Sequence, residues 1–282
     1  MQVRKTVKPN QLSDEIASNQ SLGLLKELHL LTREGQLNAD ARRKLKQVNH
    51  LYNLIFPALV DVAEQIPNFT LVDLGAGKSY LGFIIYDLFF KDKDQGQIFS
   101  VESRSELVSQ SKAMSQRLGY TRMSFVDEAI EKALLPKPVH IVTALHACDT
   151  ATDDAIIAGL DSGAEYIAIV PCCQAEVSRL LSDQKKSSLS ELWGHRIHRR
   201  EFGSHLTNVL RALVLEAYGY QVTVTELVGW EHSMKNELIL AKKIQNQNGM
   251  AKTKLEGLLK EIEMSPKIIR YYKNEYAPRS SP

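Results

Sequence analysis

An acid and two glycines follow one another at the end of a short apolar stretch, in the run Asp73-Leu-Gly75-Ala-Gly77. Glycine has no Cβ, so the chain can turn tightly here and a ligand can lie directly against the peptide backbone. A helical pattern begins at Ser79, and the first turn of a helix offers N–H groups that have no partner within the helix. The run therefore predicts a strand, a ligand-binding loop and a helix, in that order.

The spacing of the glycines separates the ligands that such a loop can hold. A P-loop needs a glycine where this chain has Val72, and a dinucleotide fingerprint needs one where it has Tyr80. The remaining pattern resembles the first motif of the class I S-adenosylmethionine-dependent methyltransferases. This resemblance implies S-adenosyl-L-methionine as the cofactor, with its charged amino group near Asp73 and its methionine half on Gly75, Ala76 and Gly77.

Two further acids end predicted strands. Glu102 closes the apolar stretch 97–102, and a carboxylate at that position, beside Ser103, can accept both ribose hydroxyls of a nucleoside cofactor. An ordinary charged residue at a strand end is the alternative. After the next strand, at 123–126, the resemblance places Asp127 and Ala129 beside the adenine, and here a simple helix cap is the alternative.

The segment His146-Ala-Cys148-Asp149 follows the apolar stretch 139–145. Ligands on open parallel sheets bind beyond the carboxyl ends of the central strands. His146 and Asp149 are therefore the candidate catalytic groups, and His146 is also a candidate contact of the cofactor. Potential metal ligands crowded into four residues, with no second pair nearby, do not make a zinc site, so we predict no metal.

A second segment, Pro171-Cys172-Cys173-Gln174, follows the stretch 166–170. RNA 5-methylcytosine enzymes place a nucleophilic cysteine after this strand, which makes Cys172 and Cys173 candidate nucleophiles. Their Thr-Cys and Pro-Cys pair is not reproduced here, and we prefer the interpretation that these small cysteines line the pocket. The Leu-His-Ala-Cys and Pro-Cys-Cys segments together resemble a methyltransferase subgroup that includes a tRNA ribose 2′-O-methyltransferase. The resemblance covers about residues 72–241 and indicates the fold more sharply than the substrate.

Basic residues concentrate in the stretch 176–203, which lies outside the minimal methyltransferase fold. Positive segments beside an active-site edge commonly capture anionic substrates through phosphate contacts. A solvated surface is an equal alternative, because runs of charge on helices usually face solvent. The residues predicted to contact structured RNA are Lys185, Lys186, Arg196, Arg199, Arg200 and His205, aided by Arg42, Arg43 and Lys46.

The periodicity of the chain predicts the elements that position these groups. A helical pattern runs from 13 to 66, with a break or kink at Pro57, and strands then alternate with helices. The resulting fold class is α/β, a Rossmann-like class I methyltransferase with a seven-stranded, mostly parallel sheet whose last strand is antiparallel. We divide the chain into an N-terminal helical region, the S-adenosylmethionine-binding domain and a basic helical tail, at 1–66, 67–243 and 244–282.

The composition fits this fold and limits the partners. The 282 residues are 44% hydrophobic and 24% charged with a net charge of +2, so any nucleic-acid surface must be local. No apolar run is long enough to span a membrane, and three cysteines, two of them adjacent, indicate a reducing, cytoplasmic setting. We therefore predict an RNA-modifying methyltransferase. The alternatives are a protein or small-molecule acceptor, a nicotinamide-dependent oxidoreductase and a non-catalytic cofactor-binding adaptor, and the oligomeric state stays unknown.

Overall fold

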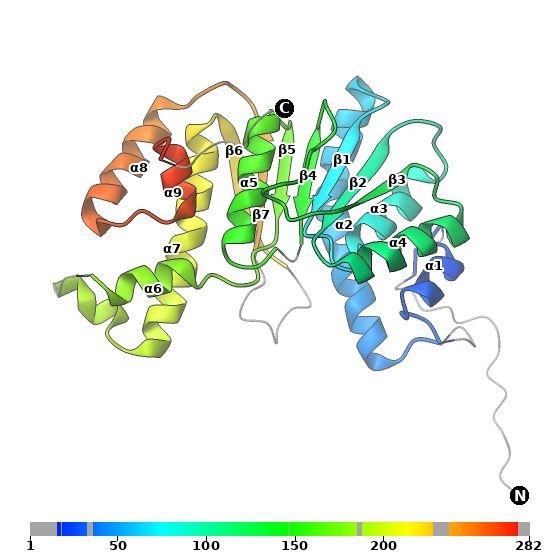
Figure 1. Ribbon diagram of the computed structural model, residues 1–282, viewed down its shortest axis with the longest axis horizontal. Helices are drawn as coiled ribbons and strands as arrows, with labels where there is room; N and C mark the ends of the chain where they lie inside the picture. The colour runs from blue at the N-terminus through cyan, green and yellow to red at the C-terminus, as the bar shows by residue number, and fades with distance from the viewer. Residues whose placement is uncertain are drawn as a thin grey trace, which may run out of the picture.

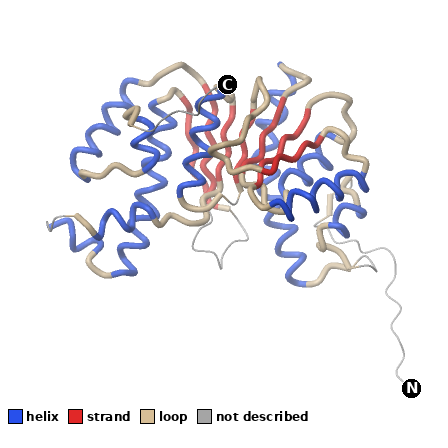
Figure 2. Tube along the Cα trace, viewed as in Figure 1, coloured by secondary structure: helices blue, strands red, loops and turns tan. Residues whose placement is uncertain are grey.

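The computed structural model describes residues 16–17, 19–32, 36–145, 147–184, 188–227 and 237–275. A single seven-stranded sheet, ordered β3-β2-β1-β4-β5-β7-β6, crosses the middle of the molecule (Figures 1 and 2). Among the described strands, β7 runs opposite to the other six and pairs antiparallel with both β5 and β6, so the predicted topology is confirmed. The strands are β1 Thr70–Leu74, β2 Gln97–Glu102, β3 Met123–Asp127, β4 Ile141–Ala144, β5 Tyr166–Ile169, β6 Tyr220–Glu226 and β7 Glu237–Lys243.

Helices cover both faces of this sheet (Figure 1). The α-helices are α1 Leu22–Glu27, α2 Ala39–Gln65, α3 Tyr80–Ile85, α4 Ser105–Leu118, α5 Thr150–Ser162, α6 Glu176–Ser182, α7 Arg196–Ala217, α8 Gly249–Ile262 and α9 Lys267–Tyr272. A π-helical turn, Tyr86–Phe90, continues α3, and a 3-10 turn, Ser188–Trp193, precedes α7. Within the described ranges, no helix combines the length and the apolar character needed to cross a membrane.

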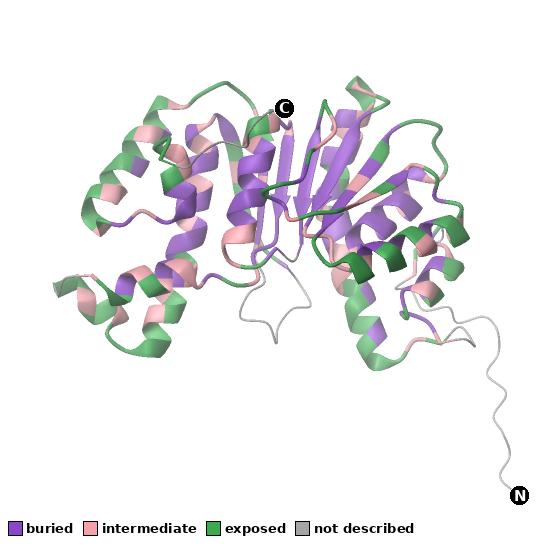
Figure 3. Ribbon diagram, viewed as in Figure 1, coloured by how far each residue is buried: buried purple, intermediate pink, exposed green. Residues whose placement is uncertain are grey.

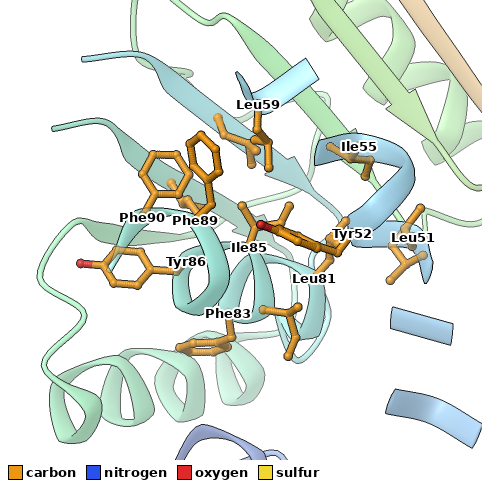
Figure 4. Packing of buried hydrophobic residues seen from close by; sticks show 14 of the residues in the cluster. Leu51, Tyr52, Ile55, Leu59, Leu81, Phe83, Ile85, Tyr86, Phe89 and Phe90 are labelled. Atoms are coloured by element: carbon orange, nitrogen blue, oxygen red, sulfur yellow. The ribbon is translucent and has the colours of Figure 1, made fainter. Parts of the chain in front are cut away.

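Two hydrophobic cores lie on opposite faces of the sheet. Successive residues of a strand point to opposite faces, and Leu71 accordingly joins the core under α2 and α3, whereas Val72 joins the core under α5 and α7. Figure 3 shows the central strands buried, and this double burial explains why β1, β4 and β5 are almost continuously apolar. Figure 4 shows the first core, in which α2 faces α3 and the π-helical turn through Leu51, Tyr52, Ile55, Leu59, Leu81, Phe83, Ile85, Tyr86, Phe89 and Phe90.

Of the break or kink predicted at Pro57, the break does not occur, because α2 continues through this residue. A proline inside a helix costs about 3 kcal/mol, and the burial of Ile55, Ala58 and Leu59 around it offsets that cost. The basic stretch 176–203 is mostly helical where it is described, since it forms α6, the 3-10 turn and the first turns of α7.

Candidate functional site

The loop after β1 presents backbone rather than side chains. Gly75 has φ +66° and Gly77 has φ +59°, a region that side-chain-bearing residues rarely adopt. The N–H of Ala76 donates to the carbonyl of Val101 at 2.9 Å, which fixes the loop against β2. A Cβ added to Gly75 would lie 3.4 Å from the Cα of Ala147, so a larger side chain would enter the space between the two loops.

Glu102 lies at the edge of this loop and is largely buried. Its carboxylate accepts hydrogen bonds from the N–H of Gly77 at 2.8 Å and from the N–H and Nε of Arg104 at 3.0 and 2.8 Å. Burial raises the pKa of this carboxyl, but the hydrogen bonds from Arg104 and Gly77 outweigh burial and lower the pKa below its ordinary value. The group is therefore ionised and can accept hydroxyl donors.

A cavity of about 250 Å³ opens between these groups and the loop after β4. It brings together four predicted cofactor contacts, Gly75, Glu102, Ser103 and Ala129. Asp73, Ala76, Gly77 and Asp127 are not among its lining residues, and His146 lies outside the described residues. Residues that were not predicted as cofactor contacts complete the wall: Arg104, Glu128, Ile130, Glu131, Ala147, Cys148, Ala151 and Asp154.

Asp73 is buried beneath the loop. Its Oδ1 accepts the hydroxyl of Thr143 at 2.8 Å, and its Oδ2 would lie 3.6 Å from a Cβ at Gly82. Burial raises the pKa of Asp73 to about 7, against the opposing hydrogen bond from Thr143. Its partner in the β1–β2 register is Ser100, whose buried hydroxyl has no hydrogen-bond partner in the described part of the chain. The contact of Asp73 with the cofactor's amino group stays a prediction.

The carboxylate of Asp149 caps the start of α6. Its Oδ1 accepts the N–H groups of Ala175 and Glu176 at 2.8 and 3.0 Å, and its Oδ2 accepts Arg179 at 3.1 Å. Burial raises the pKa of this carboxyl, but the amides of α6 and Arg179 outweigh burial and hold the pKa below its ordinary value. The backbone of Asp149 has φ +51°, and its N–H donates to Cys173 at 2.8 Å. A carboxylate bound in this way is a poor proton acceptor, which weakens the predicted catalytic role.

Arg211 is the group that the sequence reasoning missed. It is fully buried on α7, and its Nε donates to Asp153 Oδ1 at 2.7 Å while its Nη2 donates to the carbonyl of Asp149 at 2.8 Å. Arg211 stands beside Leu210 and near Val214 on the buried face of the helix. A charged residue at a core-facing helical position was the signal in the sequence, because such a residue needs a buried partner.

Polar side chains continue from Arg211 toward the loop after β5. Asn208 accepts Gln174 Nε2 at 3.3 Å and donates to Glu237 Oε2 at 2.6 Å, and Ser204 donates to Gln174 Oε1 at 2.8 Å. We call Asp149, Asp153, Gln174, Asn208 and Arg211 the network. It fixes α7 against the ends of β4 and β5.

The cysteines lie at the same strand ends. Cys148 Sγ is 2.9 Å from Cys172 Sγ, and Cys148 lines the cavity. Burial raises the pKa of Cys172, and the neighbouring Cys148 raises it further. A thiol with a raised pKa is a weak nucleophile in the absence of a metal ion, which disfavours cysteine attack by Cys172.

The predicted basic contacts divide into two groups. Arg196, Arg200 and His205 are exposed on the first half of α7, and Arg199 is half-buried. Arg42, Arg43 and Lys46 are exposed on the first turns of α2, whereas Lys185 and Lys186 lie outside the described residues. The first turns of α7 and of α2 both extend beyond the sheet on the side where β4 and β5 end, at the lower left and lower right of Figure 1.

Comparison with known proteins agrees with this architecture. Residues 43–180 match the model of a family described as a methyltransferase domain. The chain is 25% identical over 231 residues to the human Glutathione S-transferase C-terminal domain-containing protein and 23% identical to its mouse counterpart. Each match covers 74% of this chain and 34% of the relative, so the chain spans about a third of the length of these curated relatives.

Similar solved structures include methyltransferases. The SAH-bound methyltransferase PaMTH1 of Podospora anserina has a TM-score of 0.46 at 13% identity, covering 80% of this chain and 88% of that one. An rRNA methylase of Streptococcus thermophilus has a TM-score of 0.42 at 11% identity, covering 63% and 88%. The match to a methyltransferase domain therefore covers the glycine loop, Glu102 and the ends of β4 and β5, which are the parts of the chain that line or adjoin the cavity.

Proposed function

We propose that this chain is an S-adenosylmethionine-dependent methyltransferase and that it acts on structured RNA. The observation that supports the substrate class is the pair of basic surfaces beside the carboxyl edge of the sheet. Residues 39–46 carry four basic side chains and one acid, and residues 195–205 carry three arginines, three histidines and one acid. In a chain whose net charge is only +2, such local excess steers a polyanion toward one edge.

The residues around the cavity fit the cofactor. Gly75 leaves the backbone bare where a Cβ would fill the space, and the ionised Glu102 offers acceptor oxygens to ribose hydroxyls. Ser103 and Ala129 complete the proposed nucleoside side of the cavity. When bound, S-adenosylmethionine supplies a methyl group on a sulfonium sulfur that is already activated toward a nucleophile. The protein's task is therefore to hold the acceptor in line with that group.

The local acids leave these surfaces positive. Asp40 is the one acid of residues 39–46, and it pairs with Lys44 at 2.9 Å and Arg43 at 3.7 Å. On α7, Arg200 pairs with Glu201 at 2.9 Å, and both side chains are about half exposed. Exposed pairs of this kind are weak, so phosphate groups can replace the carboxylates at little cost. Both surfaces can therefore contact a backbone of phosphates.

Salt dependence of RNA binding tests this proposal. Replacing Arg196, Arg199 and Arg200 together by Ala should weaken RNA binding at low salt and flatten the salt slope by up to about one unit per lost phosphate contact. The affinity for S-adenosylmethionine should not change. As a matched control, Ala at Lys252, Lys254 and Lys260 removes the same charge from α8, at the upper left of Figure 1, and should leave the slope unchanged.

The same measurement distinguishes the alternative acceptors. If the arginine variant binds RNA with the parental affinity and slope, or if the α8 control loses as much as the arginine variant, the surface on α7 is not an RNA contact. A protein or small-molecule methyl acceptor is then the better hypothesis.

A further inference from the structure

All three cysteines of the chain meet at one place, although the sequence separates Cys148 from Cys172 and Cys173. Cys148 follows β4 and the other two follow β5, and these parallel strands are hydrogen-bonded neighbours. The three Sγ atoms all lie within 4.8 Å of one another. The sequence prediction of no metal considered only the crowded segment 146–149, whereas the sheet adds two thiols from a different loop.

We propose that Cys148, Cys172 and Cys173 bind one Zn²⁺ through their thiolates. Zn–S bonds of about 2.3 Å in a tetrahedron place the sulfur atoms roughly 3.8 Å apart, which agrees with the observed cluster. The Cys148–Cys172 separation of 2.9 Å needs to widen by only about 1 Å. None of the three cysteines forms a disulfide.

The backbone around the cluster is held in place before any ion binds. The N–H of Asp149 donates to the carbonyl of Cys173 at 2.8 Å, which ties the loop after β4 to the loop after β5. Arg211 donates to the carbonyl of Asp149 at 2.8 Å, and the hydroxyl of Thr152 donates to the carbonyl of Ala147. Ligands on such fixed loops lose little conformational freedom on binding, so the cluster is preorganised.

The surroundings suit an ion with an open coordination position. Three protein ligands leave one tetrahedral position free, as in catalytic rather than closed structural zinc sites. Cys148 and Cys173 are exposed, and Cys148 also lines the cavity with Glu102 and Arg104. The ion therefore adjoins the methyl-transfer cavity, and water or a donor atom of the methyl acceptor completes its shell.

The nearby charge compensates the thiolates. Three thiolates and one Zn²⁺ leave a net charge of −1. Arg104, which lines the same cavity as Cys148, supplies a positive charge close by.

Cobalt titration tests the site directly. Full-length protein, stripped with a chelator under reducing conditions, should develop thiolate charge-transfer and tetrahedral d–d absorption on addition of Co²⁺, saturating at one ion per chain and bleached by Zn²⁺. Each single change, Cys148→Ser, Cys172→Ser or Cys173→Ser, should weaken Co²⁺ binding by at least about tenfold. Met250→Leu, which removes an exposed sulfur elsewhere, should change nothing.

A second measurement needs no variant and so does not depend on variants that fold. One equivalent of Zn²⁺ should slow alkylation of all three thiols by N-ethylmaleimide, followed by mass spectrometry of the intact chain. Absence of the cobalt bands, or equal alkylation rates with and without Zn²⁺, would overturn the proposal. A Cys148–Cys172 disulfide that persists under reducing conditions and prevents metal binding would also overturn the proposed zinc site.

Discussion

The carboxyl edge of the sheet is built in two different ways. On the glycine side, comprising residues 73–77 and 102–104, the surface is backbone, and its shape depends on two glycines at positive φ. On the network side, side chains from α5, α7 and the strand ends hold one another, with Arg211 at the centre. Backbone conformation therefore shapes the cavity proposed to hold the cofactor. Buried polar side chains instead hold α7, the helix that carries the proposed RNA contacts.

The largest expected effect is a loss of stability when the buried charge of Arg211 is removed from the network. Arg211→Met leaves the buried Asp153 without its partner, and loss of one member of a buried pair costs about 3–5 kcal/mol of unfolding free energy. Urea denaturation measures this loss. Arg200→Met, which removes an exposed pair, is the matched control and should change stability little. An Arg211→Met protein as stable as the control would mean that the network does not hold α7.

A side chain at Gly75 should weaken cofactor binding on the glycine side. Gly75→Val places a branched side chain at φ +66°, toward Ala147 and Ile130, and should weaken S-adenosylhomocysteine binding by about a hundredfold or more. Calorimetry measures the affinity. Gly119→Ala shares the positive φ but has open space around it, so it controls for backbone strain and should bind normally. Equal affinities of Gly75→Val and the parent would show that the cofactor does not lie against this loop.

The glycine side should also make stability depend on pH, because it buries Asp73, whose pKa is raised to about 7. A pKa raised above the unfolded value means that Asp73 stabilises the fold fully below about pH 4 and loses this contribution as the pH rises through its folded pKa. Between about pH 5 and pH 8 the parent should therefore lose about 3 kcal/mol of unfolding free energy relative to Asp73→Asn.

The Asp73→Asn variant isolates this effect because Asn keeps the shape of the side chain and can still accept the hydroxyl of Thr143. Denaturation of both proteins across this pH range gives the difference. Parallel stability profiles for the two proteins would show that Asp73 does not take up a proton in this range.

The two sides also differ in how far the sequence predicts them. Gly75, Gly77 and Glu102 act through local spacing and strand ends, so the sequence alone predicted both the loop and an ionised acid beside it. The mostly parallel sheet followed from the alternation of strands and helices, which is equally local, and from the resemblance to class I methyltransferases. The continuation of α2 through Pro57 was not predictable in this way, because it depends on packing against α3.

Asp149 shows why the network side was harder to predict. Its place after a central strand is typical of a catalytic acid, and the sequence gives no sign that its carboxylate holds the start of α6. The partners that decide its role lie 26 to 62 residues further along the chain. For the same reason, the sequence did not predict that Cys148 lies beside Cys172 and Cys173, since the β4–β5 pairing brings them together.

Methyl transfer to RNA is the central claim, and a labelling experiment tests it most directly. Purified full-length protein is incubated with tritium-labelled S-adenosylmethionine and protein-free cellular RNA, with Gly75→Val as the matched inactive control. We predict label in the RNA fraction that ribonuclease releases and that the control lacks. Unlabelled RNA, together with ribonuclease-resistant label in protein when a whole lysate is supplied, would contradict the claim.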